Sequence, residues 1–291
     1  MPTIHDIIVD YQEDEISLES MEYYITVALE ANVTEEIDDE RKKEANSRTF
    51  LDRLQSIITR IIAILNKFAS KMSIVLSHAM KTDDGFRKDI NTAIRDRQPY
   101  NQVRLVSFDY DDAFLDTQVK KMDDIVSKIV TSLRTSLRQE KDSDQHPLSM
   151  SPKDLNRYIL KLLGAPPDVT DMSVYFLYVK KRYRRKKKET IFSGSNTRLY
   201  YQEALGAKKL HSIIISKSQI MKSQVEQLRN ELKTIARSGG TADHMKRNAL
   251  KKASNAAHLY NTYANFLRIY SQLRIEKMLT YRAVLTKLFN I

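Results

Sequence analysis

The sequence contains no cysteine, and only six glycines and six prolines occur among its 291 residues. Without cysteine the chain cannot form disulfides, thiolate zinc sites, iron–sulfur clusters or cysteine nucleophiles. Sandwiches and barrels need frequent turns, for which glycine and proline are the usual residues, so their scarcity favours long helices. Because 42% of the residues are hydrophobic, the chain can bury a substantial core. We therefore expect an all-α protein, folded as an elongated multi-helix bundle.

A long apolar run and a secretion signal are also missing. The most apolar window, IITRIIAILNKF, is interrupted by Arg60 and Lys67 and is shorter than the roughly 20 apolar residues that cross a bilayer. The N-terminal sequence, MPTIHDIIVDYQEDE, carries carboxylates where a signal peptide has a basic and an apolar region. We expect a soluble protein that no signal peptide exports.

Motifs for catalysis or metal binding are scarce. No two of the six histidines stand at the spacing of a metal pair, and there is neither a glycine-rich phosphate loop nor a nucleophile elbow. Acidic clusters occur, but they do not reproduce an EF-hand loop, and we interpret them as helix caps: Asp83 and Asp84, and Asp109, Asp111 and Asp112. We therefore expect no enzymatic activity, no cofactor, no metal site and no small-molecule substrate.

Charge is distributed unevenly along the chain. Residues 1–47 carry 14 acidic and 3 basic side chains, a net charge of −11, whereas residues 153–291 carry 9 and 28, a net charge of +19. Such asymmetry indicates a polyanionic partner, or an acidic arm that screens the basic surface, or both. We predict four parts: an acidic arm with the first helix (1–47), an N-terminal helical domain (48–141), a polar linker (142–152) and a basic C-terminal helical domain (153–291).

Apolar residues at helical spacing predict the elements of the first half. A first helix is expected at residues 17–32. A longer seam steps by three and four residues and should end near Gly85, which can adopt a left-handed conformation: Leu51, Leu54, Ile58, Ile61, Leu65, Phe68, Met72 and Val75. A shorter helix is expected at 86–97, an extended segment at 103–110, and a further helix whose apolar face runs through 119–137.

The second half begins with clear local signals. Ser151, Pro152 and Asp154 match an N-cap, a proline at the first helical position and an acidic first turn, so a short helix should follow and end at Gly164. Residues 172–179, MSVYFLYV, fit either a strand or a buried helical turn.

Two long heptad-like patterns complete the chain. They lie at residues 197–237 and from Thr241 almost to the C-terminus, and Gly239 and Gly240 separate them. This order predicts a long antiparallel, coiled-coil-like helical hairpin.

The segment KKRYRRKKK, residues 180–188, places eight cations within nine positions. On an exposed loop such a run needs counter-charge, from nucleic-acid phosphates or from the acidic arm; it is otherwise a solvated face or a nuclear localisation signal. No motif for sequence-specific reading is present, so any nucleic-acid contact should be non-specific. The candidate nucleic-acid-binding residues are Lys180, Lys181, Arg182, Arg184, Arg185, Lys186, Lys187 and Lys188.

Two other features could bind ligands but fit a structural role better. Six tyrosines could stack on bases, but most fall on the predicted helical stripe and should fill the core: Tyr200, Tyr201, Tyr260, Tyr263, Tyr270 and Tyr281. The basic amphipathic helix at 48–81 could lie on anionic lipid, yet its heptad regularity favours packing against protein. Membrane contact is therefore not expected.

The order of features resembles a known class of proteins. An acidic leader is followed by SLESMEYYITVALEANV, by the amphipathic FLDRLQSIITRIIAILNKF and by long tyrosine-rich helices. This layout resembles the helical virion structural proteins of large tailed bacteriophages. The resemblance implies a non-catalytic virion component, with a place inside the head as one option, whose partners are other virion proteins, further copies of itself through its helices, and packaged nucleic acid. The alternatives are a non-specific nucleic-acid-binding protein of cellular origin, located in the cytoplasm, and a membrane-surface helical scaffold.

Overall fold

The computed structural model describes residues 50–138, 146–237 and 243–291. These residues belong to one compact unit that spans 40–291. The helix expected at 17–32, and with it the acidic arm, lies outside the described residues.

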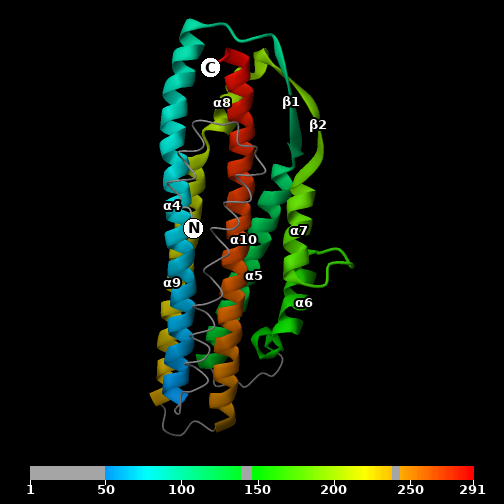
Figure 1. Cartoon of the computed structure of the whole chain (residues 1–291). Coiled ribbons are helices and arrows are strands. Elements are labelled where there is room, and N and C mark those ends of the chain that lie inside the picture. Colours follow the sequence, from blue (N-terminus) through cyan, green and yellow to red (C-terminus); the bar gives the residue numbers. More distant parts are fainter. Residues whose placement is uncertain (1–49, 139–145, 238–242) are drawn as a thin grey trace, which may run out of the picture. The chain divides into compact units, whose positions relative to one another are not determined.

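The described chain is all-α apart from one small sheet, as the sequence predicts. Its elements are, in order, α4 (Phe50–Asp96), β1 (Gln102–Tyr110), α5 (Asp112–Arg138), the 3-10 helix η2 (Pro147–Ser149), α6 (Pro152–Leu163), α7 (Met172–Tyr183), β2 (Arg184–Ser193), the 3-10 helix η3 (Gly194–Asn196), α8 (Thr197–Ala204), α9 (Ala207–Arg237) and α10 (Asp243–Phe289). The helices α4 and α10 run in one direction and α5 and α9 in the other, while the antiparallel pair β1–β2 lies on the side of the bundle away from α4 (Figure 1).

Helix α10 is the centre of the bundle. It contacts α4, α5, α7, α8, α9 and β1, and every side chain between residues 252 and 286 is buried or half-buried. With 47 residues at about 1.5 Å per residue, it is roughly 70 Å long. Between these residues the helix has no fully exposed side chain, so its buried polar side chains must find partners within the protein.

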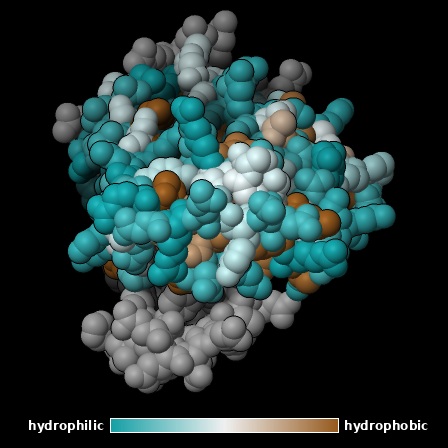
Figure 2. Space-filling model, turned by 90° about the horizontal axis from the view of Figure 1, so that it is seen from above, coloured by the Kyte–Doolittle hydropathy of each residue, from teal (hydrophilic) through white to brown (hydrophobic). Residues whose placement is uncertain are grey.

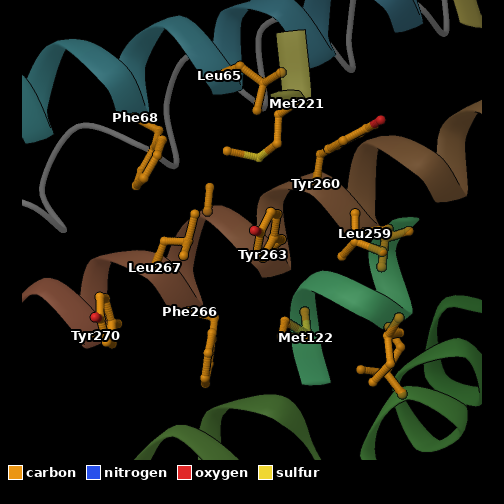
Figure 3. Packing of buried hydrophobic residues seen from close by; sticks show 14 of the residues in the cluster. Leu65, Phe68, Met122, Met221, Leu259, Tyr260, Tyr263, Phe266, Leu267 and Tyr270 are labelled. Carbon is orange, nitrogen blue, oxygen red and sulfur yellow. The ribbon is translucent and has the colours of Figure 1, made fainter. Parts of the chain in front are cut away.

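Large side chains of α10 point to opposite sides of the helix (Figure 3). Tyr260 and Leu267 lie on the side of α4 and α9, near Leu65 of α4 and Met221 of α9, whereas Phe266 points the other way. All of them belong to one hydrophobic cluster. Because α10 packs on both sides, apolar or small residues occupy much of its circumference.

The chain enters α9 through a break that the sequence pattern does not predict. One helix is expected at 197–237, but the structure has α8 and α9, separated at Leu205 and Gly206. A β-carbon on Gly206 would lie 3.0 Å from Sδ of Met278, so the chain passes close to α10 at this point. Asp83 of α4 then accepts a hydrogen bond from the Ala207 backbone N–H (3.1 Å) and starts α9. The helices α9 and α10 are antiparallel (Figure 1), while their coiled-coil character stays a prediction.

The helix end predicted at Gly85 is wrong. Helix α4 continues through Gly85 to Asp96 and includes the segment expected as a separate helix at 86–97. Ile90 and Ala93 are buried in a second hydrophobic cluster with Leu288 of α10. Continued packing against α10 keeps α4 helical, and the glycine is tolerated inside it.

Local signals at other helix ends are confirmed. The Ser151 hydroxyl accepts a hydrogen bond from the Asp154 N–H (3.2 Å), and Gly164 ends α6 in a left-handed conformation with φ of 72°. Asp111 caps α5 by accepting from the Phe114 N–H (3.1 Å). The segment at 172–179 is helical, because Asp171 caps α7 in the same way.

The described part of the predicted linker belongs to the core. Leu148 is fully buried, and the Asn255 side chain of α10 donates to the carbonyls of Leu148 (2.7 Å) and Met150 (2.8 Å). Side chains from both sides of the stretch at 142–152 pack in the same hydrophobic cluster. Two domains were expected on either side of this stretch, but the hydrophobic core is not divided there.

The sheet closes one end of the bundle. Phe192 of β2 and Tyr200 of α8 pack with Leu288 near the C-terminal end of α10. Just before β1, the Tyr100 N–H donates a hydrogen bond to the Leu288 carbonyl (2.8 Å). Seen from this end, the surface is mostly hydrophilic, with hydrophobic residues scattered in small groups (Figure 2).

The two glycines of helical segments should respond oppositely to alanine. A β-carbon on Gly85 would meet no atom within 4 Å, so Gly85→Ala should raise the free energy of unfolding by about 0.5–1 kcal/mol. Gly164→Ala should lower it by about 1 kcal/mol, because the left-handed conformation is strained for alanine. Urea unfolding followed by circular dichroism measures both values. Destabilisation by Gly85→Ala would contradict a continuous α4.

The buried His146 should make stability depend on pH. Its Nδ1 accepts from the Leu148 N–H (3.1 Å), its Nε2 has no partner, and burial, assisted by the charge of Lys252, lowers its pKa to about 4. The neutral ring therefore stabilises the fold fully above about pH 6.5, and this contribution, on the order of 3 kcal/mol, is lost as the pH falls toward 4. His146→Asn keeps an acceptor but does not titrate. In urea titrations between pH 7 and pH 4, the wild-type protein should lose more unfolding free energy than this variant. If the two proteins lose the same amount, His146 does not cause the pH dependence.

Candidate nucleic-acid interface

The basic run does not form an exposed loop. Residues 180–183 are the last turn of α7, and residues 184–188 are the first half of β2, which pairs with β1. The pairing is interrupted by a bulge: Phe108 faces Lys187 and Tyr110 faces Arg184, so two residues of β2 oppose Asp109 alone. A bulge changes the direction of the side chains beside it. Here it separates an inward arginine from the outward part of the run.

The three arginines of the run are held by carboxylates of the protein itself. Arg182 and Arg185 both reach Oδ2 of Asp111, at 2.9 and 2.5 Å. Arg184, largely buried, donates from Nε to Glu276 of α10 (2.8 Å). The hydrogen bond from Arg185, together with the Phe114 N–H, lowers the pKa of Asp111 despite some desolvation. These three arginines therefore obtain counter-charge from the start of α5 and from α10.

The five lysines of the run are placed differently. Lys181, Lys186, Lys187 and Lys188 are exposed and Lys180 is half-buried. The Lys187 ammonium lies 5.9 Å from the centre of the Phe108 ring. We call these five residues the lysine strip. Of the eight predicted site residues, the five lysines and the half-exposed Arg182 and Arg185 lie at the surface, and only Arg184 is largely buried.

A buried ionic cluster on α10 lies next to this segment. Arg274 donates to Asp112 (2.6 Å) and also pairs with Asp116, while Lys277 pairs with Asp112 and with Glu203 of α8 (2.6 Å). Burial would lower the pKa of Lys277, but the hydrogen bonds to Asp112 and Glu203 outweigh it, and the pKa is raised. The cluster joins α5 and α8 to α10 through two largely buried cations and carboxylates that are more exposed.

A second buried pair joins α4 to α10. Asp83, almost fully buried, pairs with Arg282, which also donates to the Ala204 carbonyl (3.1 Å). Burial raises the pKa of Asp83, although Arg282 and the Ala207 N–H act in the opposite direction. The sequence pattern predicts a local cap at Asp83, but this carboxylate caps a helix that begins 124 residues away.

Sequence reasoning missed these clusters, although one signal was present. Arg274 stands on the apolar stripe of the predicted last helix. An arginine in that position indicates a buried carboxylate partner, but the partner's identity depends on the tertiary fold.

The structural interpretation of the tyrosines is confirmed for those in the core. Tyr260, at the middle of α10, is fully buried and donates to Gln224 (3.3 Å). The hydroxyl of Tyr201 reaches Asn91 of α4 (3.0 Å). Four of the six have at most 6% exposed surface and cannot stack on a base: Tyr200, Tyr260, Tyr263 and Tyr270.

The apolar stripe of α4 faces the protein core. Ile61 and Leu65 are buried in the cluster shared with α9 and α10, which leaves them unavailable to a lipid surface in this fold. Across residues 50–138, 146–237 and 243–291, no helix is both long and apolar enough to span a bilayer. In the same ranges, no group of three or more histidine, aspartate or glutamate side chains is placed to hold a metal ion.

Comparisons with protein-family models, with curated proteins and with solved structures gave no match.

The two carboxylates that hold the arginines should differ in energetic weight. Glu276→Gln leaves the largely buried Arg184 without its charged partner and should lower the free energy of unfolding by about 2–3 kcal/mol. Asp111→Asn keeps the helix cap and loses only ion pairs with half-exposed guanidinium groups, so about 1 kcal/mol is expected. Urea unfolding of both variants, with a double-mutant cycle that adds Arg184→Gln, measures the coupling. Equal losses of unfolding free energy in the two variants would contradict the larger contribution assigned to the Arg184–Glu276 pair.

Proposed function

We propose that the protein is a non-catalytic structural component of a tailed-bacteriophage virion that contacts nucleic acid through the lysine strip. The observation that carries the nucleic-acid part is the division of the basic run. Its arginines pair with carboxylates of the protein, Arg182 and Arg185 sharing Asp111 and Arg184 bound to Glu276, whereas four of its lysines are exposed on a paired strand and a helix end. Lysine is a flexible, strongly hydrated point charge, which suits phosphate contact without a fixed geometry.

The setting in a virion rests on the resemblance in layout described above. A bundle organised around one buried helix suits a component that has to stay folded in a crowded assembly. Contacts with other virion proteins or with further copies belong to the same proposal. Purified particles offer a direct test, since the protein should be found in them by mass spectrometry in amounts that washing at high salt does not remove. Its absence would leave the cellular nucleic-acid-binding alternative.

The lysine strip should determine the affinity for nucleic acid. The variant Lys181→Gln, Lys186→Gln, Lys188→Gln should bind labelled oligonucleotides more weakly at low salt. For duplex, the slope of log K against log salt should become shallower by up to about 2.7, because each phosphate contact contributes about 0.9. Fluorescence anisotropy across a salt series provides both quantities.

A matched variant controls for net charge. Lys208, Lys209 and Lys222 are exposed on α9, which lies beside α4 and away from β2 (Figure 1). Their replacement by glutamine removes the same charge and should change affinity much less. Equal losses in the two triple variants, or no loss in either, would contradict a role for the strip.

A further inference from the structure

We infer that the nucleic acid held by the lysine strip is double-stranded, and that the strip contacts its phosphate backbone without stacking on bases. This inference rests on the proposed function and adds the class of ligand. It depends on what surrounds the strip: the aromatic rings nearest to it, the paired strands that carry it, and the charges that face it.

The aromatic side chains beside the strip already have partners. The Phe108 ring is approached by the guanidinium carbon of Arg184 (5.6 Å) as well as by Lys187. The Phe114 ring carries Arg182 at 5.3 Å and meets Tyr178 edge-on at 6.1 Å. Proteins that bind single strands use aromatic rings as platforms for unstacked bases. Around the strip, these rings hold the protein's own cations.

The tyrosines of this region are equally engaged. Tyr110 packs against Tyr183 with ring centres 5.2 Å apart, and its hydroxyl is hydrogen-bonded with Thr280 (2.9 Å). Tyr183 is fully buried. Tyr100 is exposed, but it precedes β1 at the opposite end of the ribbon from residues 184–188. The strip therefore offers cations without a free aromatic surface next to them.

The backbone that carries the strip is fixed. Lys187 and Lys188 are paired with β1 through the register Phe108↔Lys187 and Ser107↔Lys188, and Lys186 lies in the bulge beside them. The neighbouring arginines are paired with Asp111 and Glu276. Lysines that a fixed backbone spaces can follow the regular phosphates of a duplex with their flexible side chains, whereas a flexible single strand gains little from that spacing. Duplex DNA also has the higher charge density, so each contact releases more counterions.

The comparison of duplex with single strand tests this inference. The full chain is titrated into a labelled duplex and into a single strand of equal length, each in two base compositions, across a salt series. Duplex should bind about sixfold more tightly at 0.1 M salt if four lysines engage, because the counterion exponent is about 0.9 per phosphate against about 0.7. Base composition should change the affinity less than about twofold, since lysine contacts to phosphate carry no sequence information. Phe108→Leu should leave the duplex affinity within twofold.

The outcomes separate the inference from the proposed function. If single strands bind as tightly as duplex, or if Phe108→Leu weakens their binding, bases stack on the site and the inference fails while the nucleic-acid proposal stands. If neither form binds, the proposed function itself fails. A third outcome is that nucleic acid does not bind, but the protein floats with vesicles rich in anionic lipid or captures an acidic peptide, and that this depends on Lys186 and Lys188. The strip would then bind another polyanion, and both the inference and the proposed function would be overturned. If duplex binds more tightly than single strands, and this binding is lost in the strip variant and kept in the α9 control, the result supports both the inference and the proposed function.

Discussion

Four charged side chains of α10 are largely removed from water, and the need to neutralise them links α10 to the surrounding elements. Arg274 and Lys277 require the carboxylates of α5 and α8, Arg282 requires Asp83 of α4, and Glu276 requires Arg184 of β2. An apolar helix in the same place would pack against many neighbours in several registers. Charges that are costly to leave unpaired select one register, which is a known use of buried ion pairs. The bundle is thus specified by polar contacts laid over a hydrophobic core that alone would allow more arrangements.

The same principle divides the basic run. Arginine presents a planar fork that fits a carboxylate, and the three arginines of the run are used for that purpose. Three of the lysines lie on the surface of a strand, β2, that among the described residues pairs on one side only. Lysines on such a strand also discourage pairing with another chain. Protection against aggregation and attraction of phosphates therefore come from the same side chains, and a surface that evolved for one could serve the other.

Sequence reasoning succeeded where local chemistry decides the structure. The cap at Ser151 and the end of α6 at Gly164 follow from residues within a few turns of each other, and the class of fold follows from composition and helical spacing. It failed where distant packing decides: α4 passes through Gly85 because Ile90 has a buried site to fill, and α9 starts at Ala207 because Asp83 reaches it. The candidate site was found as a basic segment, but its division into anchored arginines and exposed lysines depends on Asp111 and Glu276. Their role cannot be read from spacing, since the partners lie up to 92 residues apart.

The central place of α10 also bears on how the molecule reaches its native state. Contacts such as that of Arg60 with Ser254, or of Asp83 with Arg282, join residues separated by 194 and 199 positions. Individual helices can form quickly, yet the core closes only after these large loops have closed, which slows folding even in a helical protein. Until α10 is in place, α4 and α9 present apolar stripes to each other and to any neighbour. During synthesis the chain would therefore hold its longest hydrophobic surfaces open until its last helix arrives, a period in which a chaperone or an early partner would have most to bind.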